Sequence, residues 1–146
     1  MPALRQRAWS AMAGKASSPS GYSGTPLWKK LGFKTGMKVQ ALHAPAHYPS
    51  LLADGPNDWV FVNAGADALH LFITEKSALK EITQLSKQMP PAIMLWVSWP
   101  KKTSLLSRGL SEGDIRETAL ACGLVDIKVC AVDADWSGLK LTRRKR

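Results

Sequence analysis

The chain has 146 residues, of which 45% are hydrophobic, and its formal net charge is +9. This length fits one domain, and this hydrophobic content excludes a chain that is disordered throughout. The longest apolar run, residues 92–99, is far shorter than the roughly 20 residues of a membrane-spanning helix, so no membrane association is predicted. The two cysteines, Cys122 and Cys130, form neither a C-x-x-C pair nor a disulfide framework, which favours free thiols and a cytoplasmic location.

The positive charge is concentrated at the two ends of the chain. Residues 1–36 contain six basic and no acidic residues, and residues 137–146 contain five basic and no acidic residues. The middle, residues 37–136, contains nine basic and eleven acidic residues, a net charge of −2. We therefore predict a flexible basic leader over residues 1–21, a single domain over 22–143 and a basic tail over 144–146. The Arg- and Ser-containing, acid-free leader is also typical of a transit peptide.

Apolar periodicity and turn residues predict ten elements along the chain. In order, these are a helix over 25–31, a strand over 37–42, a short helix over 47–53, strands over 59–62 and 69–73, a helix over 77–89, a strand over 93–98, a helix that begins at Ser111 and ends near Gly123, and strands over 127–132 and 139–142. Residues 101–110 are predicted to form a polar loop.

The order of these elements predicts an α/β fold. Strands that alternate with helices form a mostly parallel sheet, here of about six strands, with helices on both faces. The strand over 93–98 is apolar on both faces, which is typical of the centre of a parallel sheet. The last two strands are joined by a short connection and should form an antiparallel hairpin.

Two segments resemble parts of the Rossmann-like methyltransferases. Residues 31–39 (LGFKTGMKV) resemble the entry to the first strand of that fold, and the hairpin over 127–142 resembles its last two strands. The resemblance covers about residues 25–143 and implies a degenerate methyltransferase-like fold. The loop 41–47 (ALHAPAH) contains neither the glycines nor the acid that hold S-adenosylmethionine in those enzymes, and the second predicted strand ends in Val62-Asn63 without a ribose-binding carboxylate. We therefore predict no cofactor and weak or no binding of S-adenosylmethionine.

Longer strings resemble a bacterial family without a known activity. The segments YSGTPLWKKLG (22–32), MLWVSWPKK (94–102) and GLVDIKVCAVDADWSGLK (123–140) are similar to those of domain-of-unknown-function family 3052. The resemblance implies a bacterial cytoplasmic protein and does not imply any particular activity.

A ligand site is predicted at the carboxyl ends of the parallel strands, where open α/β sheets bind ligands. The candidate residues follow the central strand or lie in the closing hairpin: Ser98, Trp99, Lys101, Lys102, Asp133, Asp135 and Trp136. A tryptophan face with two ammonium groups can hold a planar anion, and two carboxylates can act as an acid/base pair or bind a cation. The alternatives are a strand that ends at Pro100 before solvated lysines, and acids that only shape the hairpin turn.

Other common sites are disfavoured. His43, His47 and His70 invite a zinc interpretation, but Pro45 separates the first two and His70 lies within a predicted strand, so no metal site is predicted. The sequence contains neither G-x-S-x-G nor the P-loop pattern, which argues against common hydrolases and nucleotidases.

Three functions stay open at this point. The leading hypothesis is a ligand-binding or protein-interaction module on a methyltransferase-like fold without the usual cofactor loop. The second is an enzyme for a small anionic substrate, with Asp133 or Asp135 as base and Lys101 or Lys102 holding the anion. The third is a nucleic-acid accessory protein that binds without sequence specificity through its basic tails.

Overall fold

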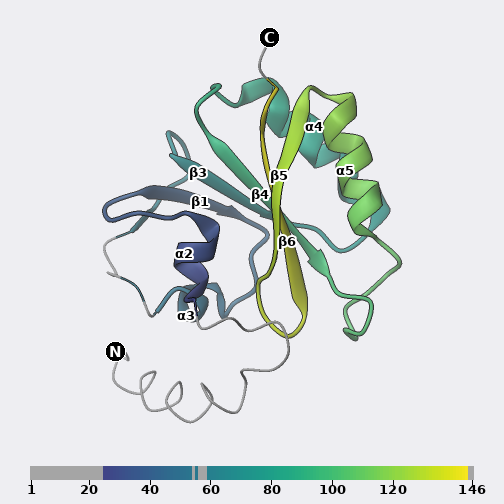
Figure 1. Cartoon of the computed structure of the whole chain (residues 1–146), viewed down its shortest axis with the longest axis horizontal. Helices are drawn as coiled ribbons and strands as arrows, with labels where there is room; N and C mark the ends of the chain where they lie inside the picture. Colours follow the sequence, from purple (N-terminus) through teal and green to yellow (C-terminus); the bar gives the residue numbers. More distant parts are fainter. Residues whose placement is uncertain (1–24, 54, 56–58, 145–146) are drawn as a thin grey trace.

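The computed structural model describes residues 25–53, 55 and 59–144 (Figure 1). The described elements are, in chain order, α2 (Leu27–Leu31), β1 (Lys38–Leu42), α3 (Tyr48–Leu51), β2 (Val60–Phe61), β3 (Ala68–Phe72), the 3-10 helix η1 (Lys76–Leu79), α4 (Lys80–Gln88), β4 (Met94–Pro100), α5 (Glu112–Ala121), β5 (Leu124–Ala131) and β6 (Trp136–Arg143). The predicted leader, residues 1–21, lies outside the described part.

The strands form one six-stranded sheet in the order β2-β1-β3-β4-β6-β5. Strands β2, β1, β3 and β4 are parallel, whereas β6 is antiparallel to both β4 and β5. The predicted α/β fold with a C-terminal antiparallel hairpin is therefore confirmed. Ser98 and Trp99 of β4 pair with Gly138 and Ser137 of β6, so they lie beside the hairpin.

Alternating side chains of the sheet build two apolar layers. One face of the sheet packs against α4 and α5. Its apolar layer includes Ile82 of α4, Ile115 of α5 and the strand residues Leu71, Val97 and Leu139. The opposite face contributes Val39, Phe72 and Trp96 to a layer that includes Leu31 and Tyr48 from the α2 and α3 regions. Figure 1 shows α4 and α5 together on one side of the sheet and α2 and α3 on the other. The predicted helices on both faces are thus observed.

Ser111 caps α5, the helix that was predicted to begin at this residue. Ser111 Oγ accepts a hydrogen bond from the backbone N of Asp114 at 3.2 Å, and Asp114 Oδ2 accepts one from the backbone N of Ser111 at 3.0 Å. This capping box satisfies two backbone donors that the first turn of α5 would otherwise leave without partners.

The hairpin strands are longer than predicted. The prediction placed strands over 127–132 and 139–142, but β5 begins at Leu124 and β6 at Trp136. The difference arises because the early part of β6 pairs with β4, where Trp136 lies opposite Pro100, and its late part pairs with the start of β5. The connecting turn is therefore only residues 132–135.

The C-terminal arginines contact helix ends. Arg143 donates from its guanidinium to the carbonyl oxygens of Ser86 and Met89 at the end of α4. Arg144 donates its backbone N–H to the carbonyl of Gly123 at 2.9 Å. A cation at the C-terminal end of a helix satisfies carbonyls without partners and complements the helix dipole.

Within the described ranges, no helix combines the length and the apolar character that a membrane span requires.

Candidate functional site at the carboxyl edge of the sheet

The connections of the sheet diverge between β1 and β3. Strand β1 leads through α3 to β2 on one side, and β3 leads through α4 to β4 on the other. In open α/β sheets this switch point opens at the carboxyl ends of the strands and is where ligands bind. The segment after β1, residues 43–47, and the segment after β3, residues 73–76, therefore border the candidate site.

His43 joins the loop after β1 to α4, the helix that follows β3. Its Nε2 lies 2.8 Å from Oε1 of Glu81, a residue of the helix that follows β3. His43 has a φ of 59°, the only positive φ of a non-glycine residue in the described part of the chain. Such a backbone conformation is sparsely populated outside glycine, so the surrounding structure must hold it. The loop after β1 is thus turned toward α4 by a side-chain pair across the switch point.

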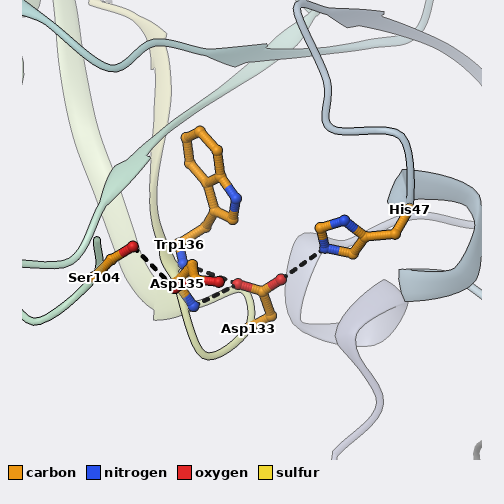
Figure 2. A network of polar contacts seen from close by, with 5 residues as sticks. All are labelled: His47, Ser104, Asp133, Asp135 and Trp136. Carbon is orange, nitrogen blue, oxygen red and sulfur yellow. Dashed lines mark hydrogen bonds and ion pairs between the residues drawn. The ribbon is translucent and has the colours of Figure 1, made fainter. Parts of the chain in front are cut away.

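His47 holds the same loop to the hairpin. Its Nε2 lies 2.9 Å from Oδ2 of Asp133, and Figure 2 shows this pair between the start of α3 and the turn of the hairpin. The other carboxylate oxygen of Asp133 accepts hydrogen bonds from the backbone N–H groups of Asp135 and Trp136, both at 2.8 Å. Asp133 therefore shapes the turn and anchors a histidine, and both of its oxygens are occupied.

Asp135 fixes the loop 101–110. Its Oδ1 accepts from Ser104 Oγ at 2.9 Å (Figure 2), and its backbone carbonyl accepts from the backbone N of Lys101 at 2.8 Å. Ser104 Oγ also accepts from the backbone N of Leu106 at 3.0 Å. The loop is held at its base, yet Leu105 is fully exposed and Leu106 is 44% exposed.

A polar chain crosses the core beneath this edge. Tyr48 Oη lies 2.9 Å from Nδ1 of His70, and His70 Nε2 lies 2.8 Å from Ser98 Oγ. His70 also stacks on Phe72 with ring centroids 4.3 Å apart. Burial lowers the pKa of His70 from 6.5 to about 3 and raises the pKa of Tyr48 above its usual value. The imidazole is therefore neutral at physiological pH and serves the packing of α3 on the sheet.

The predicted ligand residues divide into buried and accessible groups. Ser98, Trp99 and Trp136 are buried. Trp99 belongs to the layer beneath α4 and α5 and Trp136 to the layer on the opposite face, so the two rings do not form one stacking surface. Lys102 and Asp135 are exposed, and Lys101 and Asp133 are half-buried. A ligand at this edge stays a prediction, and any anion there would meet the two lysines rather than the face of Trp99.

Sequence reasoning considered the three histidines as one group, whereas the structure gives each a different partner. His43 pairs with Glu81, His47 with Asp133, and His70 with Tyr48 and Ser98. No group of three or more His, Cys, Asp or Glu side chains that could hold a metal occurs among the described residues. The position of His43 and His47 directly after β1 was visible in the sequence, but their partners are distant in sequence and were not.

Comparison with known proteins shows the fold and nothing finer. No protein-family model matches the chain, so the resemblance to domain-of-unknown-function family 3052 stays an expectation. No curated protein matches it either. Among solved structures, the chain is similar to an S-adenosylmethionine-dependent methyltransferase from Aquifex aeolicus, with a TM-score of 0.59 and 15% identity over 91% of this chain and 97% of that one.

Two further structures have the same architecture. A family 2 O-methyltransferase from Planctomyces limnophilus in complex with apigenin gives a TM-score of 0.54 and 12% identity over 97% of this chain, which spans 61% of that protein. A protein of the NAD-binding Rossmann superfamily from Streptococcus agalactiae gives a TM-score of 0.51 and 9% identity over 84% of this chain and 69% of that one. The chain therefore has a methyltransferase-like, Rossmann-type fold.

Proposed function

We propose that this chain is a non-catalytic protein-interaction module on a methyltransferase-like fold, with the loop 101–110 as its contact surface. The observation that carries the proposal is that this loop is held by hydrogen bonds at its base and points two leucines into solvent. Ordering a loop before binding reduces the entropy lost on association, so a fixed loop with exposed apolar side chains is suited to contact.

The composition of the loop indicates the kind of partner. Leu105 and Leu106 lie between Lys101–Lys102 and Arg108, and residues 101–110 contain no acidic residue. An apolar centre with a charged rim is the usual organisation of a protein interface. The proposed partner is a protein with an apolar pocket bordered by acidic residues.

The switch point of the sheet supports the non-catalytic part of the proposal. The His43–Glu81 pair crosses the switch point at which such folds bind their ligands. The loop after β1 contains no glycine that would let a cofactor approach its backbone, and Asn63 follows β2 where a ribose-binding carboxylate would be needed.

Site-specific photo-crosslinking tests the interaction surface. A photoreactive residue at position 105 should give a discrete crosslinked protein in cells, and Leu106→Asp in the same chain should abolish it. A photoreactive residue at Lys87, an exposed position on α4, is the control and should not give that product. Equal products at both positions, or no loss with Leu106→Asp, would contradict the proposal.

One observation favours an enzyme as the second candidate. Asp133 orients His47 through Nε2 at the edge where catalytic groups of such folds lie, which leaves Nδ1 of the imidazole for proton transfer. In this function His47 is the base in place of the acids, and Lys101 or Lys102 holds a small anionic substrate.

A thermal-shift screen of anionic metabolites separates the two candidates. The enzyme hypothesis predicts a metabolite that raises the melting temperature of the parent chain but not of Lys101→Ala/Lys102→Ala. It also predicts that His47→Ala still binds this metabolite and no longer converts it. If no such metabolite is found, or His47→Ala converts it as fast as the parent, the enzyme hypothesis fails and the interaction proposal is unaffected.

A further inference from the structure

The two basic ends of the sequence meet in the folded domain. Lys30 belongs to α2 near the start of the described chain, and Lys140 belongs to β6 near its end. Lys128 Nζ donates to the carbonyl oxygen of Lys30 at 3.0 Å, and Lys140 Nζ lies 3.5 Å from the place of a Cβ on Gly32. Lys30, Lys128 and Lys140, here called the lysine cluster, therefore surround the C-terminal end of α2.

Two of these lysines stand directly opposite each other. Lys128 pairs with Lys140 in the register of β5 and β6. Like charges at directly opposite positions of an antiparallel pair destabilise a sheet, so this placement costs stability unless something compensates it. Lys128 donates to a helix carbonyl, which accounts for the position of its ammonium group. Among the described residues, the structure gives no such contact for the ammonium groups of Lys30 and Lys140.

No acid in the described part of the chain compensates the cluster. The ion pairs among the described residues involve only histidines and Arg116 as cations. Asp126, the acid of β5, is paired with Arg116 of α5. The nearby Cys130 is affected by the same charges: burial raises the pKa of its thiol, and Lys30 and Lys128 oppose this rise.

The sequence that adjoins the lysine cluster is also positively charged. Lys29 and Lys34 flank the cluster in sequence, and the preceding residues 1–24 contain Arg5, Arg7 and Lys15 without an acid. A surface of lysines without ion-pair partners among the described residues is complementary to a polyanion. Lysine is a strongly hydrated point charge that suits phosphate contacts without base readout.

We propose that the lysine cluster is a docking surface for the phosphodiester backbone of a nucleic acid, which it binds without sequence specificity. This assignment differs from binding through the tails alone, because the cluster lies on the folded domain. Each phosphate that a lysine neutralises releases a counterion, so the number of contacts appears as the slope of log affinity against log salt.

Fluorescence anisotropy with a labelled duplex of about 30 base pairs, between about 50 and 200 mM salt, tests the proposal. The full chain should bind, and Lys128→Gln/Lys140→Gln should bind more weakly with a salt slope smaller by about 2. The matched control Lys80→Gln/Lys87→Gln, which removes the same charge from α4, should keep the parent slope. Because Lys128 also makes a structural hydrogen bond, Lys140→Gln alone repeats the test and should lower the slope by about 1.

Several outcomes would overturn the proposal. Failure of the full chain to bind duplex DNA and single-stranded RNA at the lowest salt would do so, as would an unchanged slope in both lysine variants. An equal decrease in the α4 control would show an effect of net charge only. Tighter binding to polyglutamate, or to vesicles of anionic lipid, than to nucleic acid would assign the surface to another class of partner.

Discussion

The hydroxyl of Tyr48 lies 2.9 Å from Nδ1 of His70 and joins helix α3 to the centre of the sheet. Helix α3 has only four residues, and Pro49 lies in its first turn. Isolated helices of this length are not stable in water, so tertiary contacts must hold this one. The contact also fixes the position of His47, which directly precedes Tyr48 and reaches the hairpin. A buried hydrogen bond in the core thus sets the geometry of the exposed edge.

Acid should destabilise the fold through His70. Its pKa is about 3 in the folded chain and 6.5 without the fold, so the unfolded chain binds a proton more readily. The stability that this residue contributes is therefore fully present above pH 6.5 and is lost as the pH falls toward 3. At about 1.36 kcal/mol per pH unit, the loss between pH 7 and pH 4 is about 3 kcal/mol.

Urea unfolding of the parent and of His70→Asn at pH 7 and pH 4 measures the contribution of His70 to stability. Carboxylates titrate in the same range, but they are common to both proteins and cancel in the difference. The parent should lose about 3 kcal/mol more than His70→Asn between pH 7 and pH 4. Parallel losses in the two proteins would show that His70 is not a buried neutral group.

Removal of the Arg143 side chain should weaken the fold. Arg143 donates to two carbonyls at the end of α4, and hydrogen bonds that involve a charged group contribute about 1.5–3 kcal/mol when buried. Because the side chain is half-buried, we expect Arg143→Met to cost about 1–2 kcal/mol. Thermal unfolding of the parent and of Arg143→Met checks this. Equal melting temperatures for the two proteins would contradict it.

Gly138→Ala should destabilise the hairpin. A Cβ at this position would lie 3.2 Å from Trp96 Cε3 and 3.2 Å from Val132 Cγ2. Trp96 cannot move aside easily, since it is fully buried and its Nε1 donates to the carbonyl of Leu31 at 2.9 Å. Overpacking of this kind costs about 1–3 kcal/mol, which should appear in the melting temperature. Ser137→Ala on the same strand is the control, and the prediction fails if both variants melt together.

The fold could be predicted from the sequence because its main patterns are local. The apolar run 93–98 identified the central strand, and Ser111 with Asp114 identified the start of α5. The ends of β5 and β6 could not be predicted in this way. Trp136 belongs to its strand because it pairs with Pro100, and only the tertiary arrangement brings these two residues together.

The candidate site was predicted less well than the fold. From the sequence, Asp133 was placed among the ligand residues, whereas His43 and His47 were considered only as metal ligands. The pairs that His43 and His47 form could not be predicted, because their partners lie 38 and 86 residues away in sequence. Trp99 appeared suited to stacking because it ends an apolar strand. The strict alternation of side chains turns it instead toward the core beneath α4 and α5. The position of Lys140 could not be predicted from the charge distribution either. It was counted within the basic segment 137–146, and in the fold its Nζ lies near Gly32 at the end of α2.

We propose that the switch point of this methyltransferase-like fold, which the His43–Glu81 pair crosses, does not serve S-adenosylmethionine. Isothermal titration calorimetry of the full chain with S-adenosylmethionine and S-adenosylhomocysteine at neutral pH tests this claim most directly. We predict no heat beyond dilution up to millimolar ligand, because the His43–Glu81 pair crosses the switch point and the loop 43–47 contains no glycine. Saturable binding of either compound with a micromolar Kd would contradict the claim.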